Sequence, residues 1–314
     1  MKQEKMFIEN KSNITYLRVI LTNKCNLNCR GCHREGQICH AEMNSFDLIK
    51  IVSSCIRIGI RKIKLMGGEP ALRSDLFYII RNIKNVDQTI DLSLISNGTA
   101  EIENYYKCFD EGLDRLNISI HGFSLDTFLI NTKSTELLWG RVRNNLNALC
   151  SKNRINKINY VLKRGVNEHD LLELILWLSK YPGVLLDVLN YLTTDYEEQH
   201  FTYGMGEIEN FLEKNIGIES IEKVSNDFSL ESTHITLKNG VTVNLKTSEL
   251  RYANFLKSCA ECKEKTFCTE GIAAVRLCTD YRIQPCLVRN DNCFSINPYC
   301  DNLEYALLEY FNNL

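Results

Sequence analysis

The 314-residue chain lacks several features that would assign it to common protein classes. It has no run of about 18 apolar residues, so we expect no segment that crosses a bilayer and no membrane partner. Residues 1–10 mix charged and polar side chains, without the apolar core of a signal peptide. Neither charge sign dominates, since 37 basic residues stand against 39 acidic ones, which argues against a nucleic-acid partner. We therefore expect a cytoplasmic protein.

Cysteine is the residue that the chain has in excess, with 14 copies. A short secreted scaffold would use so many in disulfides, but this chain is long and shows no export signal. In a reducing compartment, clustered cysteines more often bind metal. Three of them lie between Cys25 and Cys32, and seven lie between Cys259 and Cys300. The sequence therefore predicts two metal centres, one near each end.

Short apolar runs alternate with amphipathic segments up to about residue 200, and 44% of the chain is hydrophobic. The runs expected to form strands are 17–21, 63–66, 90–95, 116–120, 158–162 and 184–189. Helices are expected over segments such as 45–58, 137–149 and 170–180. Six strands that alternate with helices predict an α/β fold with a parallel sheet, open or curled into a partial barrel. Its active site would lie at the carboxyl ends of the strands.

The pattern changes beyond about residue 200. Residues 234–245 contain two short apolar runs separated by Asn239-Gly240, which predicts a β-hairpin with a tight turn. A cysteine-rich segment follows, and residues 303–311 have a helical pattern. We place a domain boundary near residue 225, which divides the chain into residues 1–225 and 226–314.

Cys25, Cys29 and Cys32 follow the first expected strand, with gaps of three and two residues. Three thiolates on one loop can bind three irons of a four-iron, four-sulfur (4Fe–4S) cluster and leave the fourth iron open to another ligand. A zinc site completed by His33 or His40 is the alternative that these cysteines alone leave open. The next motif along the chain favours the cluster.

That motif is Gly67-Gly68-Glu69-Pro70, which follows the second expected strand. Together with the cysteine gaps it resembles the signature of the radical S-adenosylmethionine (SAM) superfamily. The resemblance implies a partial (β/α)6 barrel whose cluster binds SAM through its amino and carboxylate groups. One electron from an external donor such as flavodoxin or ferredoxin would cleave SAM to a 5′-deoxyadenosyl radical, which abstracts hydrogen from substrate. The SAM-binding residues that the resemblance implies are Gly67, Gly68, Glu69, Asn97 and Ser119.

The second group of cysteines predicts an auxiliary 4Fe–4S cluster, with zinc as the alternative. Its expected ligands are Cys259, Cys262, Cys268 and Cys286. If all four bind, that cluster has no open iron and would relay electrons or brace the fold. The remaining cysteines of this region, Cys278, Cys293 and Cys300, are candidates for buried thiols without a ligand role.

Patches between about residues 15 and 297 resemble the GTP 3′,8-cyclase family of molybdenum-cofactor biosynthesis; examples are 32–36, 164–167 and 285–292. This resemblance implies a small C-terminal, twitch-like domain with the auxiliary cluster. It also implies a nucleotide-like phosphorylated substrate, which arginine grips bidentately and lysine as a point charge. The substrate-binding residues implied by the resemblance are Arg18, Lys62, Lys64, Lys157 and Arg276.

The chain departs from these families in several places. Gly31 stands where an aromatic residue usually precedes the last cysteine, at the adenine ring of SAM. Asp187 lies where the cyclases have an arginine, and Ala274 where they have a second arginine. Cysteine-rich extensions are typical of relatives that modify peptides. The sequence thus predicts a radical SAM enzyme that starts cyclisation or rearrangement of a nucleotide-like substrate. Crosslinking or epimerisation of a ribosomally made peptide is the alternative, and a zinc-binding regulatory protein is the third.

Two further side chains follow expected strands. His121 follows the fourth strand and is a candidate proton donor, with a capping role as the alternative. Tyr191 follows the sixth strand, and we expect it to face the mouth of the barrel and touch the substrate.

Overall fold

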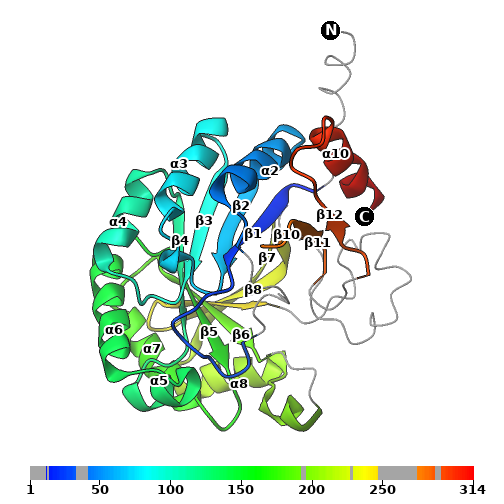
Figure 1. Cartoon of the computed structure of the whole chain (residues 1–314). Helices are drawn as coiled ribbons and strands as arrows, with labels where there is room; N and C mark the ends of the chain where they lie inside the picture. The colour runs from blue at the N-terminus through cyan, green and yellow to red at the C-terminus, as the bar shows by residue number, and fades with distance from the viewer. Residues whose placement is uncertain are drawn as a thin grey trace.

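The computed structural model describes residues 12, 14–32, 42–191, 196–226, 229–246, 274–286 and 291–314. These residues contain one 12-stranded sheet, in the order β12-β11-β10-β1-β2-β3-β4-β5-β6-β9-β8-β7 (Figure 1). The six central strands are β1 (Tyr16–Thr22), β2 (Lys62–Gly67), β3 (Asp91–Ser96), β4 (Arg115–Ile120), β5 (Lys157–Leu162) and β6 (Leu185–Asn190). They are parallel and adjacent in chain order, which confirms the predicted sheet of βαβ units.

Helices cover the outer face of these strands, as Figure 1 shows. Their bounds are Ser45–Arg57 (α2), Leu76–Val86 (α3), Ile102–Asp110 (α4), Leu125–Thr132 (α5), Glu136–Ser151 (α6), Glu168–Leu178 (α7) and Met205–Asn215 (α8). Two short 3-10 turns are η2 (Pro70–Leu72) and η3 (Tyr196–Phe201). Among the helices described, none is both long and apolar enough to cross a membrane.

Side chains alternate between the two faces of the central strands. On β1, Leu17, Val19 and Leu21 are fully buried and belong to the core shared with the helices. The side chains between them point inward. We call the space enclosed by the inner face of the six central strands the lumen of the partial barrel. The lumen is unusual for a parallel sheet because it is polar. Its side chains include Arg18, Lys64, Ser93, Asn117, Asn159 and Asp187.

Both edges of the sheet are extended by later parts of the chain. On one edge, β9 (Thr242–Lys246) pairs in parallel with β6. Next to it, β8 (Ser229–Leu237) and then β7 (Ile218–Asn226) pair in antiparallel fashion. This confirms the predicted hairpin. The domain boundary predicted near residue 225 falls at the end of β7, inside the continuous sheet, and the division into two domains stays a prediction.

On the other edge, β10 (Val275–Leu277) lies parallel to β1, and β11 (Arg282–Gln284) and β12 (Phe294–Ser295) follow it. The final helix α10 (Leu303–Asn313) lies beside α2, joined to it by an Arg57–Glu304 ion pair of 2.8 Å (Figure 1). The C-terminal segment therefore flanks the strand that leads into the cysteine loop.

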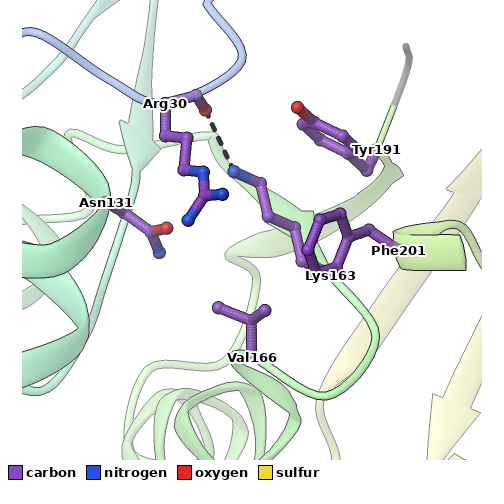
Figure 2. Close-up of a pocket in the computed structure, with 6 residues that line it drawn as sticks. All are labelled: Arg30, Asn131, Lys163, Val166, Tyr191 and Phe201. Carbon is purple, nitrogen blue, oxygen red and sulfur yellow. Dashed lines mark hydrogen bonds between the residues drawn. The ribbon is translucent and has the colours of Figure 1, made fainter. Parts of the chain in front are cut away.

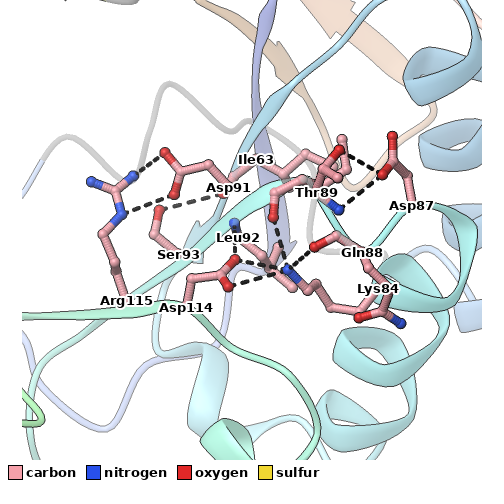
Figure 3. A network of polar contacts seen from close by, with 11 residues as sticks. Ile63, Lys84, Asp87, Gln88, Thr89, Asp91, Leu92, Ser93, Asp114 and Arg115 are labelled. Atoms are coloured by element: carbon pink, nitrogen blue, oxygen red, sulfur yellow. Dashed lines mark hydrogen bonds and ion pairs between the residues drawn. The ribbon is translucent and has the colours of Figure 1, made fainter.

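The buried Lys84 forms hydrogen bonds to residues just before β3 and β4, as Figure 3 shows. The Lys84 ammonium donates to the carbonyls of Gln88 and Ile90, both at 2.9 Å, and to the Asp114 carboxylate at 3.0 Å. Asp114 in turn accepts from the backbone N–H of Leu92 at 2.7 Å. Because every proton of the ammonium has a partner, the buried charge is tolerated here.

Candidate active site

The three N-terminal cysteines lie on the loop that follows β1. Two backbone hydrogen bonds hold this loop against the end of α5: the N–H of Asn28 donates to the Thr132 carbonyl at 3.0 Å, and that of Arg30 to the Asn131 carbonyl at 2.7 Å. Within the loop, the N–H of Cys32 donates to the carbonyl of Cys29 at 3.2 Å. The loop thus has a fixed conformation although Cys25 and Cys32 are exposed.

The thiols of this loop lie close enough to influence one another. Burial, together with the neighbouring Cys32 and Cys25, raises the pKa of Cys29 to about 12. Burial also raises the pKa of Cys25, against a hydrogen bond from the N–H of Leu27 at 3.4 Å. Thiols in such surroundings ionise when a cationic centre binds them. The donor set therefore fits a 4Fe–4S cluster, in which each cysteine binds its own iron.

The predicted Gly67-Gly68-Glu69 motif lies directly against the start of the cysteine loop. The N–H of Gly68 donates to the Thr22 carbonyl at 2.7 Å, and that of Glu69 to the Lys24 carbonyl at 2.8 Å. A Cβ atom on Gly67 would lie 2.4 Å from the Thr22 carbonyl oxygen, and one on Gly68 2.1 Å from that of Lys24. Only glycine allows the two backbones to approach so closely.

The Glu69 carboxylate is buried and joins the ends of β2 and β3. It accepts hydrogen bonds from the N–H of Ala71 at 3.0 Å, the hydroxyl of Ser96 at 2.8 Å and the N–H of Asn97 at 2.7 Å. Burial nevertheless raises its pKa. The Asn97 amide reaches the Cys25 sulfur at 3.7 Å, so the structure brings Asn97 beside the cysteine loop. Ser119 lies further away, within β4, where it accepts from the Asn159 amide at 3.2 Å.

A small pocket beside the loop contains residues that the sequence analysis missed (Figure 2). It is lined by Arg30, Asn131, Lys163, Val166, Tyr191 and Phe201. Lys163, directly after β5, donates from its ammonium to the Arg30 carbonyl at 3.0 Å. Burial and the charge of Arg30 lower the pKa of Lys163, opposed by the nearby Glu198 and Cys29. In the described part of the chain, the buried Asn131 Oδ1 has no hydrogen-bond partner, so the pocket offers an acceptor beside two cations.

Tyr191 lies at the mouth of the barrel, as predicted, but it packs against the cysteine loop. A Cβ atom on Gly31 would lie 2.4 Å from Cε2 of the Tyr191 ring. Gly31 also has a φ of 76°, which favours glycine. The Tyr191 hydroxyl donates to Glu198 at 2.6 Å. An aromatic ring from the end of β6 therefore occupies the room that a side chain at position 31 would need.

His121 has an uncharged ring at neutral pH. Burial, together with the Lys163 charge, lowers its pKa to about 4. Its carbonyl accepts a hydrogen bond from the Asn131 amide at 2.9 Å, which links it to the residue that holds the cysteine loop. The predicted role as a proton donor stays a prediction.

The predicted phosphate-binding residues gather in the lumen, below the cysteine loop. Arg18 is paired in register with Lys64 of β2 and with Arg276 of β10. Burial, together with the charges of Arg18 and Lys157, lowers the pKa of Lys64 to about 7, against the opposing charge of Asp187. Lys62 lies over the ring of Tyr16, 4.9 Å from its centroid. Arg18 precedes the end of β1 by four residues, which corresponds to about 13 Å along the strand.

Asp187 provides the acid within this basic lumen. It forms a 3.0 Å ion pair with Lys157 and accepts a hydrogen bond from the Asn244 amide. In register it lies between Asn159 on β5 and Asn244 on β9. Asp187 therefore compensates Lys157 directly, and its charge also acts on Lys64, against the charges of Arg18 and Lys157.

Three of the four predicted ligands of the auxiliary cluster, Cys259, Cys262 and Cys268, lie outside the described residues. Cys286 is buried just beyond β11, and Cys278 is buried with its sulfur 3.5 Å from the Gln284 amide oxygen. The auxiliary cluster thus stays a prediction. Within the described chain, no three His, Cys, Asp or Glu side chains gather as ligands of a single metal ion.

Comparison with known proteins identifies the family. The radical SAM superfamily model matches residues 19–178. The chain is 30% identical over 293 residues to a probable GTP 3′,8-cyclase of Pyrococcus abyssi, covering 90% of this chain and 88% of that relative. It is 28% identical over 308 residues to the probable GTP 3′,8-cyclase of Methanocaldococcus jannaschii, covering 95% and 94%.

Solved structures agree on the fold. Streptococcus suis SuiB aligns with a TM-score of 0.63 at 12% identity, over 98% of this chain and 70% of SuiB. The structure of anSMEcpe with bound AdoMet aligns with a TM-score of 0.61 at 15% identity, over 95% and 81%. These likenesses confirm the partial barrel.

The family, the fold and the cysteine loop therefore all indicate an enzyme. The alternative of a zinc-binding regulatory protein is set aside. A 4Fe–4S cluster and SAM, when bound, supply radical chemistry initiated by one electron. The chain contributes a three-cysteine loop held by backbone hydrogen bonds, a close glycine contact beside it and a polar lumen below. The chain belongs to the radical SAM superfamily, as an enzyme similar to the GTP 3′,8-cyclases.

Proposed function

We propose that this enzyme binds a nucleotide-like phosphorylated substrate in the lumen and starts its cyclisation or rearrangement by hydrogen abstraction. The observation that carries the proposal is the charge of the lumen. Arg276, Arg18 and Lys64 lie side by side across β10, β1 and β2. Like charges at this spacing repel one another in a buried site, and a bound polyanion would relieve that repulsion.

The position of the cations supports the same substrate class. The lumen lies below the cysteine loop, so phosphates bound near Arg18 would direct the rest of a nucleotide along the strands toward the cluster. On the other side of the lumen, Asp187 compensates Lys157 at 3.0 Å and lies beside Asn244. An acid there directs phosphates toward β10, β1 and β2, and leaves an amide-rich surface for the uncharged part of the ligand.

Further parts of the proposal concern cofactors and partners. Cys259, Cys262, Cys268 and Cys286 would bind an auxiliary 4Fe–4S cluster. Cys286 follows β11, which adjoins the sheet edge next to β1 and would bring that cluster to the side of the barrel. Flavodoxin or ferredoxin would supply the electron. Gly67, Gly68, Glu69 and Asn97 would hold SAM at the cysteine loop, with Ser119 further into the barrel.

A ribosomally made peptide is the alternative substrate. SuiB bound to its precursor peptide SuiA has a similar fold, with a TM-score of 0.63 over 98% of this chain, at 13% identity. A peptide would not need the row of cations that Arg276, Arg18 and Lys64 form. We therefore favour the phosphorylated substrate.

The test is anaerobic. The clusters are reconstituted, SAM and dithionite are added, and 5′-deoxyadenosine is measured with each ribonucleoside triphosphate. A large rise with one nucleotide, lost in Lys64→Met but kept in Lys84→Met, supports the proposal. Lys84 is the control because it is a buried lysine, at 6% exposure, that lies outside the lumen. The same slow background with all four nucleotides would reject these substrates and direct the search to peptides.

A further inference from the structure

One cation near the cysteine loop lies outside the lumen and has no place in phosphate binding. Lys163 follows β5, and its side chain is buried, with 6% exposure. Its ammonium donates to the carbonyl of Arg30, which lies in the loop between Cys29 and Cys32 (Figure 2). Lys163 therefore places a positive charge against the backbone that carries two cluster ligands.

Several contacts fix the position of the Lys163 ammonium and offset part of the cost of burying its charge. The ring of Tyr191 lies under the ammonium, 4.5 Å from ring centroid to Nζ. The same tyrosine donates to the carboxylate of Glu198 at 2.6 Å, so an acid lies close by. The backbone is fixed as well, because the N–H of Lys163 donates to the Asn167 side chain at 2.7 Å. An aromatic face, a carbonyl and a nearby carboxylate are all favourable partners for an ammonium.

We propose that Lys163 is a positioning residue of the cluster, which holds the Cys29–Cys32 backbone and raises the reduction potential of the cluster through its charge. Uptake of one electron from an external one-electron donor adds a negative charge to the cluster. A fixed ammonium beside the loop favours that reduced state, and local charge and hydrogen bonding are the means by which proteins set such potentials. The proposal does not depend on the identity of the substrate.

The experiment is a redox titration of the reconstituted holoenzyme without SAM or substrate, followed by EPR of the reduced cluster. Three variants separate charge from hydrogen bonding: Lys163→Met removes both, Lys163→Gln keeps an N–H donor, and Lys163→Arg keeps both. We expect a more negative midpoint potential in Lys163→Met and Lys163→Gln, and the wild-type potential in Lys163→Arg. Iron content is measured for each variant, since Lys163→Met also loses the bond to the loop.

Arg164→Gln provides the matched control. Arg164 is the next residue, but its guanidinium is exposed and pairs with Glu207 at 2.7 Å, away from the cysteine loop. We expect the wild-type potential from this variant. If Lys163→Gln keeps its iron and titrates at the wild-type potential, the proposal is wrong. A failure of nucleotide stimulation would leave this result unaffected, so the two proposals are tested separately.

Discussion

The α-carbon of Gly68 packs so closely on the cysteine loop that a Cβ atom there would lie 2.1 Å from the carbonyl oxygen of Lys24. That contact is with backbone, which cannot rotate away. Since Lys24 directly precedes Cys25, the position of the first cysteine depends on the absence of a side chain at residue 68.

We therefore expect Gly68→Ala to shift the loop, lower stability by about 2–3 kcal/mol and reduce the iron bound after reconstitution. Iron analysis and thermal unfolding measure the two effects. Gly140→Ala is the control, because Gly140 lies in α6 with nothing within 4 Å of its Cβ position. It should keep its iron and gain up to about 1 kcal/mol. Full iron content in Gly68→Ala would contradict the role of this contact.

The cysteines allow a comparison of ligand and core thiols. Cys29→Ala should lower the iron per chain and abolish the reducible cluster of the N-terminal loop. Cys55→Ala removes a fully buried thiol of α2, in the core between helix and sheet. Its expected cost is about 1 kcal/mol, with no loss of iron. Iron per chain and the EPR spectrum after reduction distinguish the two variants, and equal iron loss in both would argue that folding, not ligation, is responsible.

Much of this arrangement was predictable from local patterns. The six central strands, the hairpin over β8 and β9 and the loop cysteines follow from apolar runs, an Asn-Gly turn and cysteine gaps, all of which are short-range signals. The polar lumen was accessible too, because Arg18 and Lys64 break otherwise apolar strands.

Other features depend on contacts between distant parts of the chain. Lys163 lies 133 residues from Arg30, and no spacing rule connects them. Its one signal was its place directly after a strand, at the edge where the cysteine loop lies. The sequence shows that glycine replaces an aromatic residue at position 31. Only the folded structure shows that the Tyr191 ring fills the space beside it. The partner of Asp187 was equally hidden until the pairing of β5 with β6 brought Lys157 within reach, two residues from the register position opposite Asp187.

The buried lysine at the base of β3 and β4 offers a test of stability apart from function. Lys84→Met removes the ammonium that donates to Gln88, Ile90 and Asp114. The two carbonyls and the carboxylate then lose their hydrogen-bond donor. Asp114 is 41% exposed in its side chain, so water compensates part of the loss. We expect a destabilisation of about 1–3 kcal/mol in denaturant titrations, with unchanged iron content. Loss of the cluster in this variant would indicate that the strand starts and the cysteine loop are coupled.

The titration of Lys64 should make anion binding in the lumen weaker as the pH rises. Burial and the neighbouring cations lower its pKa to about 7 from the usual 10.5. Above pH 7 the free protein therefore holds Lys64 mostly uncharged, and an anion loses one of its partners. We expect the affinity for tripolyphosphate to fall as the pH rises from 6 to 8.5, measured by calorimetry. Lys64→Arg stays charged throughout, so its affinity should decline much less over the same range.

Stability should change with pH in the opposite direction. A lysine whose pKa is lower in the folded state than in the unfolded state binds fewer protons when folded between pH 7 and 10.5. Its unfavourable contribution is complete below pH 7 and diminishes as the pH rises through that window. Relative to Lys64→Met, the wild-type protein should therefore gain stability between pH 7 and 9, and bound tripolyphosphate should reduce that gain by favouring the charged form. A constant difference between the two proteins across this range would show that Lys64 keeps an ordinary pKa and that the lumen is more open to water than its burial implies.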